Sequence, residues 1–460
     1  MITDKPLITE CREAWEGLQW FRRRRRRCKD FAYGRQWGDS VRLPDGRIVS
    51  EERRMLEAGR PAVTNNLIGR MIKQIIGYYR HLSREEADAD ARVALTGTFS
   101  RLEATDARAL EEFLISGMAV QRVGREEDGW LPCDRVSNRS PERVFFRRFA
   151  EPDGADARFV GLLHDLSLST LTERFAGSDS RGMDRIAGSF RRYRGASVPC
   201  MPGCVDFSEA DIPDLTRVIE VWRLRYIKVM EIFDPSRGRL YTGVADAAAS
   251  RRFEETNRRR IEKGQRPLAA RTRRAEVWEE SWLLADGTLL ERAYHPRRTR
   301  LPIAMRLYPM VDGEVHSLVE SVIDQQKFVN RLVGLLDEIL GASAKGAVLY
   351  PVDQLPDGMT WQELRRLWSS PSAILPFKRT SKSIQPRQLS GGGSCSGATE
   401  LLKTQLSLFD DISGSGGIFS GGGRADGADM ARLQRDGAAI AMLDILSAFR
   451  EFVRSRPSVG

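Results

Sequence analysis

Histidine and cysteine, the residues that most often bind zinc, are scarce in this chain. Its 460 residues include only 4 histidines and 6 cysteines. The closest cysteine pair, in CMPGC at residues 200–204, has one residue too many for a CxxC motif, and no second pair follows it. No zinc site or other metal site is therefore expected. The sparse cysteines also show no disulfide framework, which fits a reducing cytoplasm.

Several motifs that carry chemistry are also missing. The sequence has no GxxxxGK[ST], GxSxG or HExxH segment, which argues against a P-loop ATPase, an α/β-hydrolase and a zinc protease. Among its 63 acidic residues, the spacing singles out no pair for acid–base work. We therefore expect a structural or binding protein that is not an enzyme and needs no cofactor. No run of about 18 uncharged apolar residues occurs, so no membrane helix is expected.

Positive charge is what the chain has in excess. Lys and Arg number 73 and the net charge is +10, a balance that favours an anionic partner such as nucleic acid without showing where contact occurs. Six consecutive arginines, Arg22 to Arg27, lie in a segment expected to be helical. They would point all round that helix and repel each other unless an anion is near. Two interpretations remain open: a nucleic-acid patch or localisation signal, or a helix end that faces solvent or a partner.

The first 312 residues predict a mixture of helices and strands. Apolar residues from Leu67 to Ile76 recur at helical spacing after Asn65, the expected N-cap, and a further helix is expected to end near Gly117. The segment TRVIEVWRLRYIKVMEIFD alternates like a half-buried strand, and EVWEESWLLADGTLLERAYHP predicts a hairpin that turns at Asp286-Gly287. Between them, residues 249–274 predict a basic, helical excursion.

The pattern changes near Gly313. Apolar residues then recur in a rhythm close to a heptad, which predicts a helical rod of roughly 40 Å. They are Val315, Leu318, Val322, Val329, Val333, Leu336 and Leu340. An ordinary amphipathic core helix is the alternative. Beyond it, KGAVLYP and SAILPFK are expected to be strands around a short helix in MTWQELRRLW. A second long helix, a glycine-rich loop and a last helix to about residue 456 follow.

The order of several short motifs resembles the P22-like portal proteins of tailed bacteriophages. FAYGRQW, EAGRPAVTNNLIGRMIKQIIG and DGEVHSLVESVIDQQKFVNRL carry most of the similarity, and SPERVFFRRFAEPDGADARF and DDISG add to it. The matching residues are Gly34, Gln36, Trp37, Gly59, Arg60, Pro61, Asn66, Gly77, Asp156, Ala157, Gln325, Gln326 and Asn330. The resemblance covers nearly the whole chain. It departs from the family at Arg147 and Arg148, where an aspartate-proline pair is usual.

The resemblance implies an α+β portal fold. Its expected parts are a mixed α/β wing at 1–312, a first stem helix at 313–342, a small α/β clip at 343–393, a second stem helix at 394–412, a tunnel loop at 413–428 and a long wing helix at 429–460, with a crown that is short or absent. Such chains form a homo-oligomeric ring, usually of twelve subunits, around a DNA channel. Expected partners are double-stranded DNA bound without sequence specificity, the terminase large subunit, head-completion or tail adaptor proteins, and the major capsid and scaffolding proteins. Assembly would occur in the host cytoplasm, and the ring would occupy one capsid vertex of the virion.

The resemblance also implies candidate functional residues. In the tunnel loop, glycines permit backbone conformations closed to other residues, and the residues expected to face DNA are Ser415, Ile418, Phe419, Ser420 and Arg424. The expected channel charges of the stem are Asp324, Lys327, Arg331 and Lys403. The expected stem contacts between subunits are Val322, Val329, Val333 and Leu336. In the clip, Trp361, Leu364 and Trp368 share one helix face, which is expected to be the clip's own core or a surface for a partner.

Other function classes remain open at this point. A DNA-binding structural protein of another kind would bind duplex as a monomer or dimer, so native mass separates it from a ring. A nucleic-acid enzyme with metal-binding carboxylates would show magnesium-dependent cleavage. For the glycine-rich loop, the alternative is a disordered linker between two helices.

Overall fold

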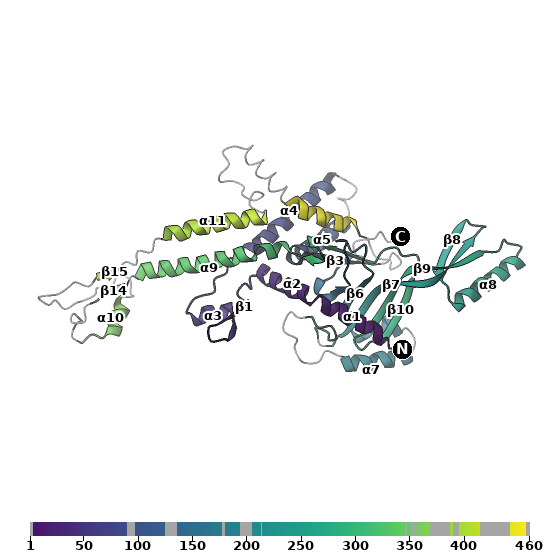
Figure 1. Cartoon of the computed structure of the whole chain (residues 1–460), viewed down its shortest axis with the longest axis horizontal. Helices are drawn as coiled ribbons and strands as arrows, with labels where there is room; N and C mark the ends of the chain where they lie inside the picture. Colours follow the sequence, from purple (N-terminus) through teal and green to yellow (C-terminus); the bar gives the residue numbers. More distant parts are fainter. Residues whose placement is uncertain are drawn as a thin grey trace.

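The chain folds into an elongated molecule with a helical hairpin projecting at one end and a strand-and-helix projection at the other (Figure 1). The computed structural model describes residues 3–89, 97–124, 136–176, 180–193, 205–212, 214–345, 347–350, 355–356, 358–368, 387–389, 395–414 and 442–456. Among these, no helix combines the length and the apolar character that crossing a membrane requires.

A helical body forms the centre of the molecule. Its main helices are α1 (Lys5–Gly17), α2 (Gln19–Ala32), α4 (Leu67–Ala89), α5 (Gly97–Ser116), the first half of α9 (Leu318–Lys345) and a helix over 442–454. A small hairpin of β1 (Ser40–Arg42) and β2 (Ile48–Ser50) leads into α3 (Glu51–Glu57). The largest apolar cluster joins Phe31, Met71, Phe113, Val322 and Phe449, so α2, α4, α5, α9 and the 442–454 helix share one core.

An antiparallel sheet of six strands lies beside this body. Its order is β10-β9-β7-β6-β5, with β8 paired to β7. The strands are β5 (Val144–Phe146), β6 (Phe159–Leu166), β7 (Thr216–Asp234), β8 (Arg239–Val244), β9 (Ala269–Leu284) and β10 (Leu289–His295). Gly161 on β6 is required by packing, because a Cβ there would lie 2.0 Å from the Phe145 ring.

Shorter elements complete the fold. They are β3 (Met118–Val123), β4 (Val136–Asn138) and β11 (Ile303–Leu307) in a second sheet; β12 (Met310–Val311) with β13 (Glu314–Val315); β14 (Ala347–Leu349) with β15 (Arg387–Leu389); helices α6 (Leu168–Leu171), α7 (Ser180–Tyr193), α8 (Ala247–Glu262), α10 (Trp361–Trp368) and α11 (Cys395–Ser413); and the turns η2 (Pro141–Arg143) and η3 (Thr172–Ala176).

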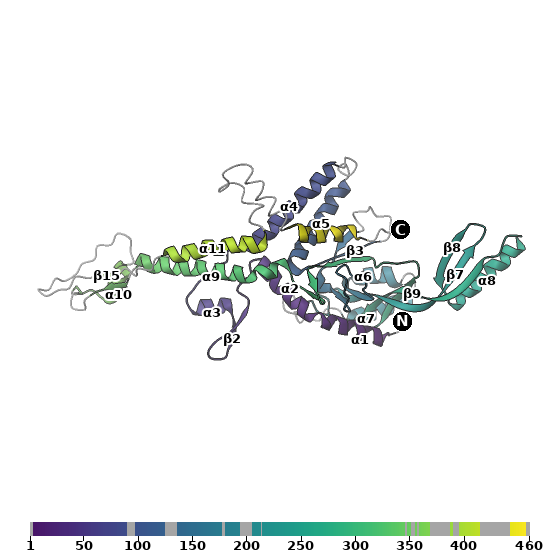
Figure 2. The ribbon, with the colours of Figure 1, turned by 45° about the horizontal axis from the view of Figure 1, so that its top comes forward.

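Strands β7 and β9 are the two longest strands of this sheet, and they extend beyond its other strands. Their pairing runs from Val218↔Leu284 to Phe233↔Ala269. The last eight residues of β9, Val277–Leu284, are buried, whereas the first six are exposed. The exposed part of β9 and the C-terminal part of β7 leave the body together with β8 and α8. In this region α8 has no buried residue, whereas β7 buries Val229 and Met230. We call residues 225–275 the arm; it projects from the body in both views (Figures 1 and 2).

Most expected elements are present, with shifts at their boundaries. The mixed α+β class, the helix after residue 66, the hairpin at Asp286-Gly287 and the basic helix are confirmed. The expected N-cap Asn65 is wrong by one residue, since the Asn66 Oδ1 accepts the bond from the Gly69 N–H at 2.9 Å. Val315 belongs to a strand and not to the rod, because the chain turns at Gly313 (φ +83°) before α9 begins.

Three expected segments fall partly or wholly outside the described residues. The helix expected at 429–460 is described over 442–454. The strand expected in SAILPFK and the loop after Gly414 are not among the described residues. The helix of MTWQELRRLW and the strand of KGAVLYP are confirmed as α10 and β14.

Candidate functional site

The projecting hairpin consists of α9 and α11, which lie side by side along most of the length of α11 (Figures 1 and 2). Phe409, near the C-terminal end of α11, lies in the same core cluster as Val319 and Val322, near the N-terminal end of α9. The two helices are therefore antiparallel. One pair of ends is rooted in the body, and the other carries the small β14–β15 sheet and α10.

Four amide side chains anchor the root of α9. Gln36, Asn66, Gln326 and Asn330 come from three separate segments, and we call them the amide network. Asn330 donates to the Gln36 Oε1 at 2.6 Å, Gln36 donates to the Asn66 Oδ1 at 3.1 Å, and Gln326 donates to the Asn330 Oδ1 at 3.1 Å. The network is a buried polar group in which each member completes another's hydrogen bonds.

The amide network also holds the start of α4. The Oε1 of Gln326 accepts from the backbone N–H groups of Leu67 at 2.9 Å and Ile68 at 3.2 Å. These are N-terminal helix donors, which have no partner inside their own helix. The Nε2 of Gln326 donates to the Asn65 carbonyl at 2.6 Å. A side chain of α9 thus caps α4, which fixes the angle between the projecting hairpin and the body.

A layer of ion pairs surrounds this anchor. The Lys327 ammonium lies 2.7 Å from Asp39 and 2.9 Å from Glu51, and Arg331 lies 3.1 Å from Glu51. Burial alone would raise the pKa of Asp39, but hydrogen bonds from Arg27 and Lys327 outweigh it and hold that pKa below its usual value. Lys327 and Arg331, expected as channel charges, therefore both pair with carboxylates of their own chain, and Arg331 keeps 56% of its side chain exposed.

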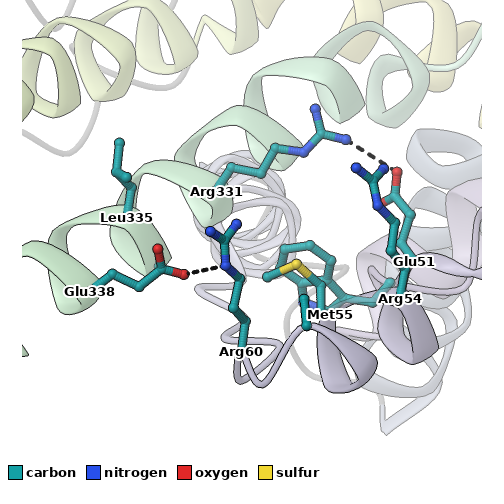
Figure 3. A pocket seen from close by; sticks show the side chains of 10 residues that line it. Glu51, Arg54, Met55, Arg60, Arg331, Leu335 and Glu338 are labelled. Carbon is teal, nitrogen blue, oxygen red and sulfur yellow. Dashed lines mark hydrogen bonds and ion pairs between the residues drawn. The ribbon is translucent and has the colours of Figure 1, made fainter.

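A pocket of about 430 Å³ opens between α3 and α9, next to these pairs. Figure 3 shows Arg331 reaching toward Glu51 and Arg60 toward Glu338, with Met55 and Leu335 also on its wall. The Arg60–Glu338 contact is 2.7 Å. The segment GRP, which contains Arg60, therefore contacts α9 directly.

Five of the six arginines in the run on α2 have a partner inside the chain. Arg25 is 3% exposed and bonds both oxygens of Glu112 at 2.7 Å. Arg24 reaches Glu320 on α9 at 2.7 Å, and Arg22 lies over the Trp15 ring at 3.6 Å. Arg26 and Arg27 pair with Glu142 and Asp39. Carboxylates from other segments and the Trp15 ring therefore offset much of the expected repulsion, and the run is a structural hub.

The expected subunit contacts of α9 need a correction. Val322 is 0% exposed and Val329 is 2% exposed within a single chain, because α9 turns these residues toward the body and α11. Val333 and Leu336 are half-buried. The apolar side chains that the hairpin leaves exposed are instead Phe328, Leu335, Leu340, Leu401, Leu406, Leu408 and Ile412.

The remaining expected site residues are placed as follows. Asp324 on α9 is exposed. Lys403 on α11 is exposed and pairs with Glu400 of the same helix at 3.1 Å. Ser415, Ile418, Phe419, Ser420 and Arg424 lie outside the described residues. On α10, Leu364 is buried, whereas Trp361 is exposed and meets the Tyr350 ring edge-on. The side chain of Trp368 is not among those described.

The six-stranded sheet contains a buried acid network that the sequence analysis missed. Glu220 accepts from Arg122 at 3.0 Å, His164 at 2.8 Å and Trp222 at 2.8 Å. Burial would raise the pKa of Glu220, but its bond to His164 and the Arg122 charge lower it to about 2. Glu280 is held in the same way by His295 and Trp282. Both acids stand in a Glu-x-Trp pattern, at 220–222 and 280–282, but the pattern also occurs at 13–15 and 276–278 and so does not single them out.

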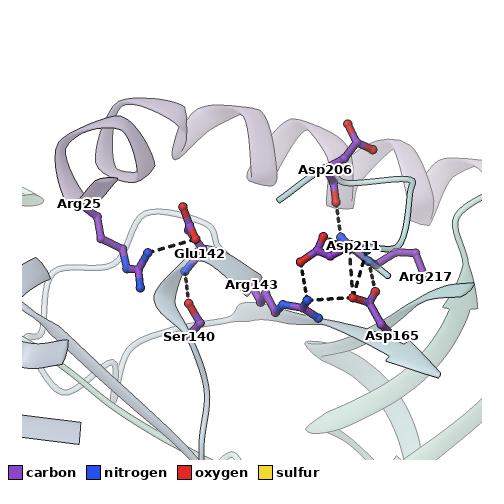
Figure 4. Close-up of polar contacts among 8 residues, drawn as sticks. All are labelled: Arg25, Ser140, Glu142, Arg143, Asp165, Asp206, Asp211 and Arg217. Atoms are coloured by element: carbon purple, nitrogen blue, oxygen red, sulfur yellow. Dashed lines mark hydrogen bonds and ion pairs between the residues drawn. The ribbon is translucent and has the colours of Figure 1, made fainter. Parts of the chain in front are cut away.

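Two arginines beside this network, Arg143 and Arg217, are likewise paired. Figure 4 shows Arg143 and Arg217 both reaching Asp165 and Asp211. Arg217 is fully buried and lies 2.6 Å from Asp165. In the described parts of the chain, no three His, Cys, Asp or Glu side chains are grouped to hold a metal ion.

Comparison with known protein families finds one match. Residues 9–452 match the model of the phage P22-like portal protein family. No curated protein sequence matches the chain.

Proposed function

The chain belongs to the phage P22-like portal protein family, and from this premise we propose that it forms the ring-shaped DNA conduit at one capsid vertex. Proteins of this family are structural and not enzymes. Genome packaging and ejection would both pass DNA through the ring. The match over residues 9–452 is the observation that carries the proposal.

The exposed face of the α9–α11 hairpin supports a ring of copies. Phe328 and Leu335 are 39% and 46% exposed on α9, and α11 adds Leu401, Leu408 and Ile412. Apolar side chains gathered on a projecting element are a feature of association surfaces. In a ring, usually of twelve copies, the hairpins of neighbouring subunits would cover these residues. Asp324 and Lys403 are exposed on the same hairpin and are our candidates for channel charges.

The partners follow from this role. Double-stranded DNA would pass without sequence-specific contacts, since each fixed phosphate contact resists movement. The clip region, which includes α10, β14 and β15, would dock the terminase large subunit and the head-completion or tail adaptor proteins. The wing would contact the major capsid and scaffolding proteins. The assembled ring would be part of the virion.

The experiment that tests the ring is negative-stain microscopy of the purified chain. We expect rings with a central hole. The double variant Phe328→Lys, Leu335→Lys should lose them while remaining folded, because an unpaired charge buried in a contact costs several kcal/mol. Ser321→Lys, at an exposed polar position of the same helix, is the matched control and should form rings. Normal rings from the double variant would refute the proposed contact face. A wild-type monomer or dimer that binds duplex would favour the other DNA-binding class.

The glycine-rich segment is proposed as the tunnel loop. Replacing Ile418 and Phe419 with serine should change the free energy of unfolding by less than about 0.5 kcal/mol, as for other surface positions. Ring formation should persist, but particles should package poorly or leak genome in a nuclease-protection assay. Full DNA retention would contradict the assignment. Misfolding would instead indicate that the two residues form a core, since each cavity costs roughly 3–5 kcal/mol.

A further inference from the structure

Most of the excess charge of the chain is concentrated in the arm. Residues 225–275 contain 14 Lys and Arg against 6 Asp and Glu, a net charge of +8, and the whole chain has a net charge of +10. The arm projects from the end of the body opposite the α9–α11 hairpin (Figure 2). The rest of the molecule is thus nearly balanced in charge, with 59 Lys and Arg against 57 Asp and Glu.

Few of these charges are neutralised by the fold. Glu231 pairs with Arg271 and Arg273, Asp234 with Arg260, and Glu255 with Arg259. The carboxylate of Asp246 accepts the N-terminal N–H of α8 from Ala249. The structure describes every residue of the arm. Ten exposed cations of the arm have no ion pair with a described residue: Arg225, Lys228, Arg237, Arg239, Arg251, Arg252, Arg258, Lys263, Arg266 and Arg274.

This arrangement differs from the paired arginines of the body. Ten like charges on this narrow element repel each other, and its six carboxylates offset that repulsion only in part. Eight of the ten are arginines, whose planar guanidinium groups bind phosphate through two parallel hydrogen bonds. They lie on the strands, the β7–β8 turn, α8 and the connection from α8 to β9, so they are spread over the length of the arm and not gathered in one pocket. Such a surface fits a long polyanion.

We propose that the arm binds the phosphate backbone of a nucleic-acid duplex. A duplex has about one negative charge per 1.7 Å of its axis, so an elongated element that carries many cations can meet several phosphates at once. Contacts of this kind position a protein without reading bases. This is a second nucleic-acid contact, apart from the proposed channel, and it does not depend on ring formation.

The test uses the full-length chain and a fluorescently labelled 30-base-pair DNA duplex. Binding is measured by anisotropy over a range of salt concentrations, with a 30-base-pair RNA duplex and poly-glutamate as parallel probes. The arm variant replaces Arg237, Arg239, Arg251 and Arg258 with glutamine. We expect at least tenfold weaker duplex binding. The slope of log K against log salt should fall by about 3 to 4, since each phosphate contact contributes about 0.9. Loss with both duplexes indicates the shared backbone, and loss with one indicates which nucleic acid is bound.

The matched control removes the same charge elsewhere. Arg23, Arg42, Arg54 and Arg191 are exposed, and the structure gives them no ion pair among the described residues. Their quadruple glutamine variant should bind duplex within twofold of wild type. Equal losses in the two variants would overturn the proposal, and so would poly-glutamate binding that is tighter than duplex binding and is lost in the arm variant. Micrographs of the same preparations show whether rings form, so a failed arm and a failed ring are distinguishable.

Discussion

The arginine run of α2 and the arm are both rich in arginine, but in the folded chain their arginines have different environments. Both are dense in arginine, and both are predicted to be helical and solvated over part of their length. In α2, five of the six arginines contact an acid or an aromatic ring, and Glu320, 296 positions away from Arg24, is among the acids. In the arm, ten cations have no ion pair. Charge density alone therefore does not distinguish a structural hub from a binding surface.

The physical difference is burial. A buried ion pair becomes costly when one partner is removed, because the other charge stays desolvated. An exposed charge or surface pair contributes about 1 kcal/mol or less. Arginines of α2 should therefore be sensitive to substitution in stability measurements, whereas those of the arm should be sensitive only in binding measurements. The predictions below probe this contrast.

The largest effect is expected at Arg25. Substitution to glutamine leaves Glu112 and Glu142 without their buried partner, and this should lower the free energy of unfolding by about 3–5 kcal/mol. The neighbouring Arg23 is exposed, and Arg23→Gln should change it by less than about 0.5 kcal/mol. Urea denaturation followed by circular dichroism compares the two. Equal effects would mean that the run is a surface feature.

The next effect concerns the amide network. Gln326 is 0% exposed, and Gln326→Ala removes the acceptor for two backbone N–H groups and the donor to the Asn65 carbonyl. Each buried group left without a partner costs about 1–3 kcal/mol, so the same urea assay should show a loss of roughly 2–4 kcal/mol. The adjacent Gln325 is only half-buried, and Gln325→Ala is the control. A loss below 1 kcal/mol for Gln326→Ala would show that water replaces the side chain.

A pH dependence is expected from Asp39. Because its pKa is lower in the folded chain than its usual value of about 3.9, Asp39 stabilises the fold above that pH. This contribution is lost as the pH falls through the lower, folded pKa. Asp39→Asn should therefore flatten the decrease in unfolding free energy between about pH 5 and pH 3. Asp337→Asn changes an exposed carboxyl on α9 and should keep the wild-type slope. An unchanged slope in Asp39→Asn would mean that Lys327 and Arg27 do not hold this carboxyl.

The smallest effect is expected in the arm. Arg251→Gln and Arg258→Gln remove exposed cations, so each should change the free energy of unfolding by less than about 0.5 kcal/mol. Relief of repulsion would act in the stabilising direction. A loss above 1 kcal/mol in thermal or urea denaturation would reveal an intramolecular role and weaken the contrast with α2.

Local patterns were sufficient for many elements. Helical spacing predicted α4, the Asp-Gly signal predicted the β9–β10 turn, and the amphipathic MTWQELRRLW predicted α10. The pattern did not give the start of the rod, because Val315 pairs with Met310 in a two-residue strand before α9 begins. It also placed Val322 and Val329 on a face between subunits, whereas a single chain already buries them. The spacing of apolar residues indicates which side chains are buried, but it does not indicate whether the same chain or another subunit buries them.

The amino-acid sequence by itself indicated many of the helices and strands and their order along the chain. It also showed that familiar catalytic motifs are absent, and it placed the chain in the portal family. Gln36, Asn66, Gln326 and Asn330 were recognisable as motif residues, but only the tertiary structure showed that they form one network. The tertiary structure likewise decided which arginines are paired and which are free. The physical reason is that pairing and burial depend on contacts between segments hundreds of residues apart, and local periodicity contains no information about those contacts.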